Sequence, residues 1–552
     1  MRGVVPVAGV TRKFDVAGQH VEMRTGWAPR ASGAVTIRAG GTMVLCTAMV
    51  SHHSSPNYDY LPLHCDYEVR LYAMGKMPGD YPRNEGRPSK QAMLDSRTID
   101  RGIRPLFPAG FRNEMQAVAI VLSIDPVVDP VILAINGTSA ALYISEAPFQ
   151  RPVAAVRMGL FDGRLTVNPP MVEMERSELD LVVVGTEDAI VMVEAAANEV
   201  SEDLIADALK LAHNDIRTIC TQIDDLRAAV GKPKLDVGEP EHDRAMKFVV
   251  SEFVNSRLDR SIPQCDGVGI DHHIQALRQE MKTSLLERWP SSRMALDLLF
   301  EEVMKDRVRH QIIEEGVRLD GRGLKDIRPI EVQTGVLPRA HGSALFRRGQ
   351  TETLTVLTVN TVIGPQPVAG IEESKRFMHH YNGPPFGFGE TRSLRSPGGR
   401  EIGHGALAER ALLPVIPPIE DWPYAMHLVS EVLSQSGSSA MASVCGGTLA
   451  LIEAGVPIRA PVAGIAMGLV TLAGDYAILT DPLTSEDFYG DMDFKIAGTA
   501  EGITAFQLDM KLEGLASAVL AEILEQAREA RLFVLGKMRG AMPEARDGRL
   551  LL

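Results

Sequence analysis

A short acidic segment near the carboxyl end of the chain carries residue types that could bind a metal ion and a phosphate. Residues 484–495 read TSEDFYGDMDFK. If the last five of them form a strand, Asp491, Asp493 and Lys495 share one face, because side chains alternate with a period of two. Asp487 can return to that face through the intervening glycine turn. Grouped carboxylates suit Mg²⁺ or Mn²⁺, and a lysine beside them supplies charge for phosphate oxygens. The composition is equally compatible with an acidic turn that holds one surface ion pair.

Two further segments could bind an anion. Residues 434–443 read SQSGSSAMAS and lead into a helical pattern. Serine hydroxyls and the unpaired backbone N–H groups of a helix start can meet a phosphate there, although ordinary helix capping by serine explains the same pattern. Residues 398–405 read GGREIGHG, and glycines let the backbone approach a ligand closely. Arg400 and His404 stand in this turn, where the histidine is also compatible with a structural role.

These segments belong to the second of two copies of one long domain. Residues 25–33, TGWAPRASG, return as residues 334–342, TGVLPRAHG, at an offset of 309 (334 − 25). The offset still holds where MGL at residues 158–160 meets MGL at residues 467–469. A repeat of this length is a duplicated domain, far longer than solenoid repeats of ~20–50 residues.

The two copies differ at the acidic segment. There the offset is 313 (493 − 180), and DLVVVGT of the first copy aligns with DFKIAGT of the second. Lys495 then stands where the first copy has Val182, and Asp487 where it has Met174. The sequence therefore predicts that the second copy carries the chemistry and that the first is structural.

Size and composition indicate a globular protein without a membrane segment. The chain has 552 residues, of which 45% are hydrophobic, enough for two or three buried cores. The longest apolar run, residues 460–474, is broken by glycines and is shorter than the ~20 residues that a spanning helix needs. The first residues, MRGVVP, lack the apolar core of a signal peptide. We expect a cytoplasmic protein, or one of an organelle interior, with no membrane contact.

Net charge and cysteine content further limit the class of protein that the sequence can encode. A net charge of −14 excludes a generally basic nucleic-acid coat but leaves room for local basic channels. Basic residues are concentrated at residues 83–112 and 318–348. The five cysteines are dispersed and form no Cys-x-x-Cys pair, so buried, reduced thiols are expected.

Each copy shows a mixed α and β pattern. A predicted β-hairpin is followed by a small-residue helix and a further strand, an arrangement typical of helices packed on sheets. The predicted ranges are 34–38 with 42–50 and 344–347 with 351–359 for the hairpins, 137–145 and 447–454 for the helices, and 153–160 and 462–469 for the strands.

Between the copies the pattern becomes helical. Ser201 is a candidate N-cap followed by two acidic residues, and apolar residues recur at three-to-four spacing from Ile205 to Leu226. Further helices are expected at about 243–257, 271–289 and 293–314. The fold class is therefore α+β, with domains expected at residues 1–200, 201–315 and 316–552.

Four motifs of the second copy together resemble the polynucleotide phosphorylase family. They are LPRAHGSALF at 337–346, REIGHG at 400–405, GSSAMASVCG at 437–446 and GDMDFK at 490–495. The resemblance runs from about Phe14 to Leu535 and includes the helical insert. It implies two tandem ribonuclease PH-like domains joined by an all-helical insert, and a homotrimeric ring around an RNA channel.

The resemblance also implies a reaction. Such enzymes degrade single-stranded RNA from the 3′ end, use inorganic phosphate to release nucleoside 5′-diphosphates, and polymerise diphosphates in reverse without a template. Because phosphate is the nucleophile, catalysis needs positioning and charge stabilisation rather than an activated serine or cysteine. Mg²⁺, with Mn²⁺ as a substitute, would offset charge on the attacked phosphodiester. mRNA degradation is the implied role, and an RNA-degradation complex is a candidate partner.

The resemblance assigns site residues by position. The catalytic set is Asp487, Asp493, Lys495 and His404, with Asp487 and Asp493 as metal ligands. The phosphate-binding set is Ser438, Ser439 and Arg400. The RNA-binding set is Tyr81, Arg83, Arg97 and Arg101.

The chain departs from the family pattern in four places. It reads YPRN at residues 81–84 where the family usually shows Phe-Phe-x-Arg, so base stacking at the channel constriction falls to Tyr81 alone. Ala440 replaces the third serine of a triplet, and Gly399 replaces one arginine of a pair. The sequence ends at Leu552, before the KH and S1 domains usual after this core. These departures bear on RNA affinity and processivity more than on reaction type.

Two alternatives stay open at this point. One is a single-domain phosphorolytic ribonuclease that acts on tRNA 3′ ends, against which the duplication and the insert both argue. The other is a catalytically weak ring that serves as an RNA-binding or degradosome-like scaffold. Retention of Asp487, Asp493 and Lys495 argues against a scaffold, whereas the missing hydroxyl and arginine argue for it. Release of ADP rather than AMP from poly(A) distinguishes a phosphorolytic enzyme from a hydrolytic one.

Overall fold

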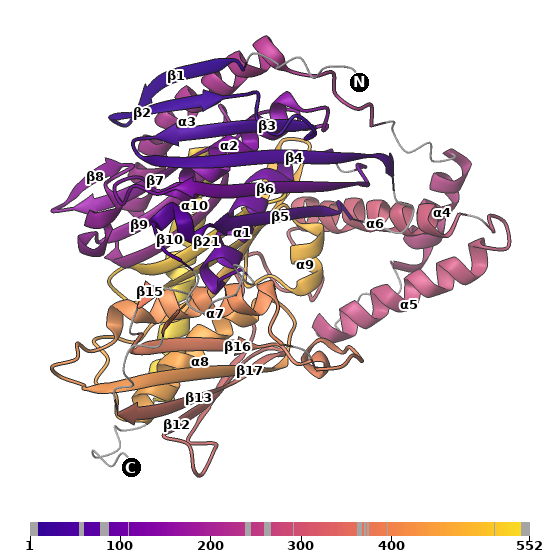
Figure 1. Ribbon diagram of the computed structural model, residues 1–552. Coiled ribbons are helices and arrows are strands. Elements are labelled where there is room, and N and C mark those ends of the chain that lie inside the picture. Colours follow the sequence, from indigo (N-terminus) through magenta and orange to yellow (C-terminus); the bar gives the residue numbers. More distant parts are fainter. Residues whose placement is uncertain are drawn as a thin grey trace. The chain divides into compact units, whose positions relative to one another are not determined.

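The computed structural model describes most of the chain (Figure 1). The described residues are 9–54, 60–77, 88–108, 110–237, 244–258, 267–290, 292–361, 367–368, 371–372, 375–394, 396–512 and 514–542. They form two compact units. The first unit comprises Met1–Glu239, Gln366–Glu373 and Leu512–Ala521, and the second comprises Pro240–Pro365, Ser374–Lys511 and Glu522–Leu552. The domain limits expected from the sequence, 1–200, 201–315 and 316–552, remain a prediction.

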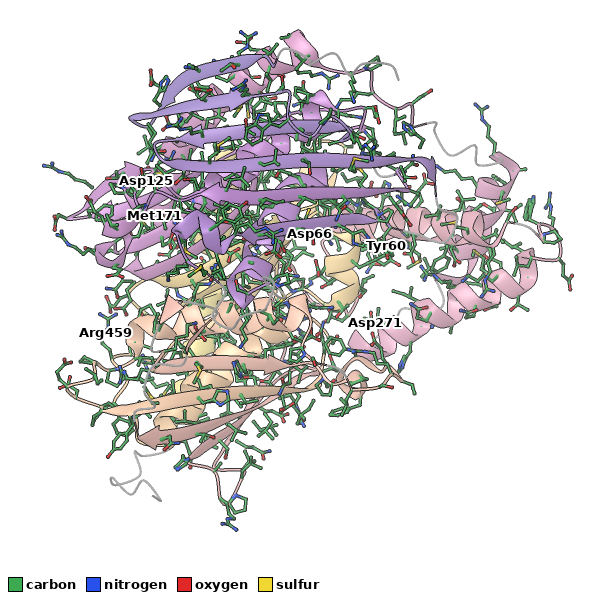
Figure 2. All side chains as sticks on the ribbon, in the orientation of Figure 1. Tyr60, Asp66, Asp125, Met171, Asp271 and Arg459 are labelled. Carbon is green, nitrogen blue, oxygen red and sulfur yellow. The ribbon has the colours of Figure 1, made fainter. Side chains whose placement is uncertain are left out.

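The first unit contains a six-stranded sheet and a second group of four strands. The sheet runs in the order β1 (Thr11–Val16), β2 (Gln19–Arg24), β3 (Gly33–Ala39), β4 (Thr42–Ser54), β6 (Asn113–Ser123) and β5 (Leu63–Val69). Its strands are antiparallel except for the parallel pair of β5 and β6. Across this pair Gln116 donates a hydrogen bond at 2.8 Å to Asp66. Figure 2 labels Asp66. The second group runs in the order β10 (Ile190–Val200), β9 (Leu179–Gly185), β7 (Ala154–Phe161) and β8 (Arg164–Val167).

Three helices complete the first unit. They are α1 (Lys90–Ile103), α2 (Pro130–Ile144) and α3 (Glu202–Val230), and the short hairpin of β14 (Pro367–Val368) and β15 (Ile371–Glu372) also belongs here. Helix α2 packs on β3, β4 and β7 and is buried along nearly its whole length. Its many alanine and glycine residues suit this position, because small side chains let a helix approach two sheets at once.

The second unit repeats this architecture. Its five-stranded sheet runs in the order β11 (Ile330–Thr334), β12 (Gly342–Arg348), β13 (Thr351–Thr361), β17 (Tyr424–Ser434) and β16 (Phe377–Asn382), with β16 and β17 parallel. Its second group runs in the order β19 (Asp475–Thr480), β18 (Ala463–Leu472), β20 (Met492–Gly498) and β21 (Ile503–Met510). The helices of this part are α7 (Gly399–Leu412), α8 (Ser439–Glu453), α9 (Thr484–Tyr489) and α10 (Ser517–Arg539), of which α10 begins in the first unit.

The structure confirms the predicted duplication element by element. Helices α1 and α7 begin at residues 90 and 399, and α2 and α8 begin at residues 130 and 439, both at the offset of 309 read from the sequence (399 − 90 and 439 − 130). Strands β3 and β12 show the same offset and open the predicted antiparallel hairpins with β4 and β13. The α+β class is confirmed as well. The small-residue helices begin earlier than predicted, at Pro130 and Ser439, and Asp129 caps the first of them.

The helical insert is also confirmed. Ser201 caps α3 by accepting a hydrogen bond from the backbone N–H of Leu204. The further helices are α4 (Arg244–Leu258), α5 (Gly267–Leu285) and α6 (Arg293–His310), within a few residues of the predicted ranges. Their apolar faces share one core with Leu479 and Tyr489 of the second unit, so the insert supports β19 and α9 from one side.

The four cysteines of the described residues are free thiols. Cys46, Cys220 and Cys445 are buried and unbridged, Cys65 is partly buried and unbridged, and Cys265 lies outside the described residues. Among the helices of the described ranges, none has the length and apolarity that a membrane crossing requires.

Gly342 makes a close contact that the duplication repeats. A Cβ at this residue would overlap the carbonyl oxygen of Ala450 in α8, and a Cβ at Gly33 would overlap the carbonyl oxygen of Ala141 in α2. Because backbone atoms cannot move aside cheaply, we expect Gly342→Ala to destabilise the second unit by about 1–3 kcal/mol. Chemical denaturation of the full chain measures the effect.

Gly536 provides the matched control. It lies within α10, and a Cβ there would have no neighbour within 4 Å. Gly536→Ala should leave stability unchanged or raise it by up to about 1 kcal/mol, since glycine is a poor helix former. Equal unfolding midpoints for the two variants would show that the contact between β12 and α8 is not the constraint inferred here.

Candidate active site

The predicted carboxylate and lysine lie together on β20. Asp493 and Lys495 are two residues apart in this strand, share one face and form an ion pair. The Lys495 side chain is 8% exposed and that of Asp493 is 23% exposed, so the pair is only partly open to solvent. Two flanking strands enforce this geometry, because β20 pairs with β18 on one side and with β21 on the other.

Asp491 does not join this face, contrary to the sequence-based expectation. It precedes the strand and is fully buried, with an ion pair to Arg309 of α6. Its carboxylate also accepts hydrogen bonds from the backbone N–H of Thr471, at 2.9 Å, and from the Thr471 hydroxyl, at 2.8 Å. A buried carboxylate needs such partners, so Asp491 anchors the helical insert to β18 and is not part of the open cluster.

Asp487 reaches the same region from α9. Its carboxylate is about half exposed and lies 3.2 Å from the Lys511 ammonium. Burial, together with the negative charges of Asp487 and Asp509, raises the pKa of Asp493, while Lys495 acts in the opposite direction. Asp487, Asp493 and Lys495 therefore share one electrostatic environment.

Asp509 is a fourth member of the cluster that the sequence reading missed. It stands directly opposite Asp493 in the antiparallel register of β20 and β21, and Gln507 stands opposite Lys495. Gln507 donates a hydrogen bond to Asp509 at 2.8 Å. The sequence shows that Gln507 and Asp509 are two residues apart. It does not show that their strand pairs with β20 in the register that puts them opposite Lys495 and Asp493.

The donor set fits a magnesium ion that keeps part of its water shell. Within the described residues, no group of three or more His, Cys, Asp or Glu side chains is arranged to hold a metal. Mg²⁺ commonly binds through one or two carboxylates and completes its shell with water and substrate phosphates. Asp487 and Asp493 supply such a pair, and the excess of carboxylates over Lys495 leaves negative charge for a cation to balance.

The predicted phosphate segment forms the start of α8. Ser438 is the residue before the helix and has a left-handed backbone with φ of 34°, after Gly437 with φ of 98°. The Ser438 hydroxyl does not cap the helix and finds no hydrogen-bond partner among the described residues. Ordinary capping is therefore not its role. The first-turn N–H groups of α8, which have no partner inside the helix, remain available to an anion.

Ser439 is held by side chains of the same unit. Its hydroxyl lies 2.7 Å from the hydroxyl of Tyr381 and donates to Gln435 at 3.0 Å. The Tyr381 ring packs edge-on against the buried His404 of α7, with ring centroids 4.9 Å apart. The positive charge of Arg400 lowers the pKa of Tyr381, against the larger effect of burial, which raises it. The structure thus brings Arg400 and His404 to the segment that holds Ser439.

The predicted RNA-binding residues belong to the first unit. Tyr81 and Arg83 lie outside the described residues. Arg97 and Arg101 lie on α1, where the Arg101 guanidinium pairs with Glu194 of β10 at 2.6 Å and is largely buried. A role of all four residues in RNA binding remains a prediction.

In the first copy a carboxylate of the chain itself occupies the position at the helix start where the second copy has Ser438. Asp129 occupies the position of Ser438 (438 − 129 = 309), and its carboxylate caps α2 by accepting from the Val131 N–H at 2.8 Å. Arg157 joins Asp129 to Asp180, the counterpart of Asp493, through ion pairs of 2.6 Å each. The cavity beside them has a volume of about 20 Å³, which suits a water molecule rather than a phosphate. A position occupied by the chain's own carboxylate is consistent with the predicted structural role of the first copy.

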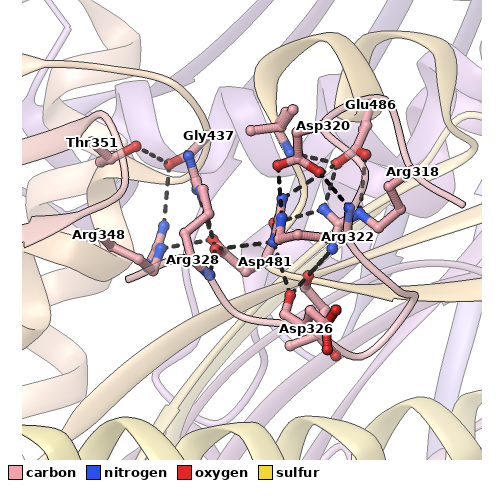
Figure 3. Close-up of polar contacts among 12 residues, drawn as sticks. Arg318, Asp320, Arg322, Asp326, Arg328, Arg348, Thr351, Gly437, Asp481 and Glu486 are labelled. Atoms are coloured by element: carbon pink, nitrogen blue, oxygen red, sulfur yellow. Dashed lines mark hydrogen bonds and ion pairs between the residues drawn. The ribbon is translucent and has the colours of Figure 1, made fainter. Parts of the chain in front are cut away.

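A buried ion-pair network lies behind the phosphate segment of the second copy (Figure 3). Its centre is the fully buried Asp481, whose carboxylate pairs with Arg348 at 2.6 Å and with Arg328 at 2.7 Å. Arg348 donates to the carbonyl oxygens of Gly437 and Ser438 at 3.1 Å each. Arg328 donates to the carbonyl oxygen of Ser436.

The same network reaches α9. Arg318 is fully buried and pairs with Glu486, the residue before Asp487, with one contact at 3.0 Å. It also donates to the carbonyl oxygens of Thr480 and Asp481, at 2.6 and 2.8 Å. One set of side chains therefore supports both the phosphate segment and the helix that carries Asp487.

Comparison with known proteins identifies the domains of the chain. The model of domain 1 of the 3′ exoribonuclease family matches residues 17–148 and again residues 326–457, and that of domain 2 matches residues 151–215. The repeated match confirms two tandem ribonuclease PH-like domains.

Relatives named polyribonucleotide nucleotidyltransferase match along almost the whole chain. That of Heliobacterium modesticaldum is 47% identical over 528 residues, covering 95% of this chain and 74% of the relative. Those of Roseiflexus castenholzii and Halothermothrix orenii are also 47% identical, with 97% and 95% of this chain and 73% and 76% of the relatives covered. With this identity over nearly its full length, the chain belongs to the polyribonucleotide nucleotidyltransferase family.

Proposed function

We propose that this chain is a phosphorolytic 3′-to-5′ exoribonuclease, a transferase that uses inorganic phosphate to release nucleoside 5′-diphosphates from RNA. The reaction is reversible, so the enzyme also polymerises nucleoside diphosphates without a template. The observation that carries the proposal is family membership over 95% of the chain, in a molecule whose second copy alone pairs a lysine with the aspartate of β20.

The proposed chemistry follows from the two parts of the site. Phosphate bound at the first turn of α8 attacks the phosphorus of the last phosphodiester, and the bond from that phosphorus to the 3′ oxygen of the preceding nucleotide breaks. The 3′ oxygen leaves with a proton, and the attacking phosphate becomes the β-phosphate of the released diphosphate. Lys495 stabilises charge that develops on the phosphoryl oxygens. Ser438, Ser439, Arg400 and His404 orient the phosphate, which is the positioning that such a reaction needs.

Asp487 and Asp493 would hold Mg²⁺, or Mn²⁺ in its place. The bound ion would neutralise phosphate charge and align the reacting oxygens. The exposed carboxylate of Asp487 and the partly buried one of Asp493 support this assignment, since a magnesium ion bound to both still has room for water and substrate.

The wider setting is proposed from the family. Single-stranded RNA would reach the site past Tyr81, Arg83, Arg97 and Arg101, in a homotrimeric ring that encloses a channel. RNA turnover in the cytoplasm, including mRNA degradation, is the proposed role, and an RNA-degradation complex is the proposed larger partner.

Loss of either charged residue on β20 should nearly abolish activity. Asp493→Asn removes a metal ligand, and Lys495→Ala removes a charge used mainly in the transition state. We expect each variant to lower phosphorolysis of poly(A) by ~10²–10³-fold, the effect of losing one preorganised stabilising group. The measurement is ADP release in the presence of phosphate and Mg²⁺.

Val182 is the matched control in the first copy, because it occupies the position of Lys495 there. Val182→Ala should leave ADP release nearly unchanged. If Asp493→Asn and Lys495→Ala also keep the parent rate, the second copy does not hold the active site, and a scaffold becomes the better interpretation.

The metal assignment has its own test. Removal of divalent ions with EDTA should stop ADP release, and Asp487→Asn should raise the Mg²⁺ concentration needed for half-maximal activity, because one of two carboxylates is lost. Glu501→Gln removes an exposed charge from the loop between β20 and β21 and should leave the Mg²⁺ titration in place. Identical titrations for all three proteins would exclude Asp487 as a ligand.

The proposed ring can be tested by mass. Light scattering should report about three times the chain mass of 60.0 kDa. An active species with the mass of a single chain would remove the ring from the mechanism.

A further inference from the structure

We propose that Asp481 is a positioning residue that, through Arg328 and Arg348, sets the phosphate-binding turn at Ser436–Ser438 for the reaction proposed above. The inference rests on that proposed function and adds residues that the motifs did not single out. Asp481 itself is fully buried and does not touch substrate. Its influence passes through the two arginines to the backbone of the turn (Figure 3).

The turn has a conformation that needs external support. Ser438 adopts the left-handed region with φ of 34°, which is unfavourable for a residue with a side chain. Gly437, with φ of 98°, passes so close to the carbonyl oxygen of Pro482 that a Cβ would overlap it. Strained backbone of this kind persists only where surrounding groups over-determine it.

The arginines fix the direction of the peptide groups in this turn. The carbonyl of Gly437 belongs to the same planar peptide as the N–H of Ser438, and the carbonyl of Ser438 to the same peptide as the N–H of Ser439. In a trans peptide the two groups point in opposite directions. Because Arg348 binds both carbonyl oxygens at 3.1 Å, the two N–H groups are turned away from the guanidinium. They become the donors that a phosphate at this helix start would use.

The network also carries an excess of positive charge. Its largely buried side chains are four arginines and three carboxylates, namely Arg318, Arg322, Arg328, Arg348, Asp320, Asp481 and Glu486. An uncompensated buried cation is costly unless an anion comes close. Phosphate at the neighbouring turn would supply that anion.

The first copy has neither these charges nor the strained turn, because Asp129, the counterpart of Ser438, has an extended backbone with φ of −68°. The offset of 309 pairs Arg328 with Gln19 and Arg348 with Ala39, and the offset of 313 pairs Asp481 with Asn168. Asp481 and Asn168 both have left-handed backbones, with φ of 54° and 45°. Their backbone N–H groups donate to equivalent carbonyls, that of Ala466 at 2.9 Å and that of Arg157 at 2.6 Å.

Neutral contacts replace the ion pairs in that copy. Gln19 donates to the carbonyl of Asn168 at 3.2 Å, where the second copy has the pair of Arg328 and Asp481. A threonine hydroxyl donates to the equivalent carbonyl in both copies, from Thr42 to Val128 at 3.3 Å and from Thr351 to Gly437 at 2.8 Å. The first copy therefore folds with neutral contacts here, and the charged network occurs in the copy whose Ser438 has the left-handed backbone.

The test replaces the three charged residues of the second copy by the neutral residues that stand at the equivalent positions of the first copy. The variant combines Arg328→Gln, Arg348→Ala and Asp481→Asn, so that Asp481 is removed together with both arginines. Arg322, which lies 3.5 Å from Asp481, keeps its ion pair with Asp320 at 2.7 Å. We expect this full-length variant to fold, with a circular dichroism spectrum like that of the parent. Its KM for phosphate in poly(A) phosphorolysis should rise by about tenfold or more, while its KM for poly(A) changes less.

A binding measurement accompanies the kinetics. Addition of inorganic phosphate should raise the Tm of the parent by mass action and should raise that of the triple variant much less. The single change Asp481→Asn leaves Arg328 and Arg348 facing a neutral partner, and it should affect the phosphate response more than Asp481→Glu, which keeps the charge.

The outcomes separate this inference from the proposed function. A parent enzyme that releases no ADP contradicts the proposed function itself. An active parent with a folded triple variant whose KM for phosphate and phosphate-induced Tm shift are unchanged overturns the positioning role. Failure of the triple variant to fold also overturns it, because the charges would then serve the fold rather than the site.

Discussion

The backbone at Ser436–Ser438, before α8, is held by the arginines around one buried carboxylate, Asp481. Removing Asp481 from water is costly, and only close cations recover that free energy. Arg328 and Arg348 come from the strands and loops at the start of the domain, whereas Asp481 comes from the segment between β19 and α9. The ion pairs that stabilise the Asp481 carboxylate therefore hold together segments that are far apart in the sequence. The proposed phosphate-binding turn at Ser436–Ser438 and helix α9 both contact these segments.

The duplication shows how one architecture supports two outcomes. At the start of α2 the first copy places its own carboxylate, Asp129, where a helix N-terminus favours an anion, and Arg157 neutralises it. At the start of α8 the second copy has Ser438, whose hydroxyl finds no partner within the part of the chain that the structure describes, and Ala466 stands at the position of Arg157. The first copy thus supplies an anion to this helix terminus from its own chain, whereas the second copy does not.

Charge balance gives the β20 cluster its chemical character. Asp487, Asp493 and Asp509 lie near Lys495, and Asp487 also pairs with Lys511, so that three carboxylates face two ammonium groups. Under the proposed function, a divalent ion held by Asp487 and Asp493 would offset this negative charge and stabilise charge on the phosphate that is attacked. Asp491, two residues before Asp493, has its own arginine and takes no part. Adjacent acidic residues of one segment can therefore have different roles, according to the cation that each one meets.

The sequence by itself determined the duplication, the helical insert and the α+β class, and it provided the candidate site residues, because periodicity and repeated motifs are local properties of the chain. It also placed Asp493 and Lys495 on one face, since alternation along a strand needs no knowledge of its neighbours. Tertiary structure decided which residues meet across strands and loops. The register of β20 and β21 added Asp509, and the burial of Asp491 removed it from the site. The Asp481 network joins residues more than a hundred positions apart, and no local pattern encodes such a contact.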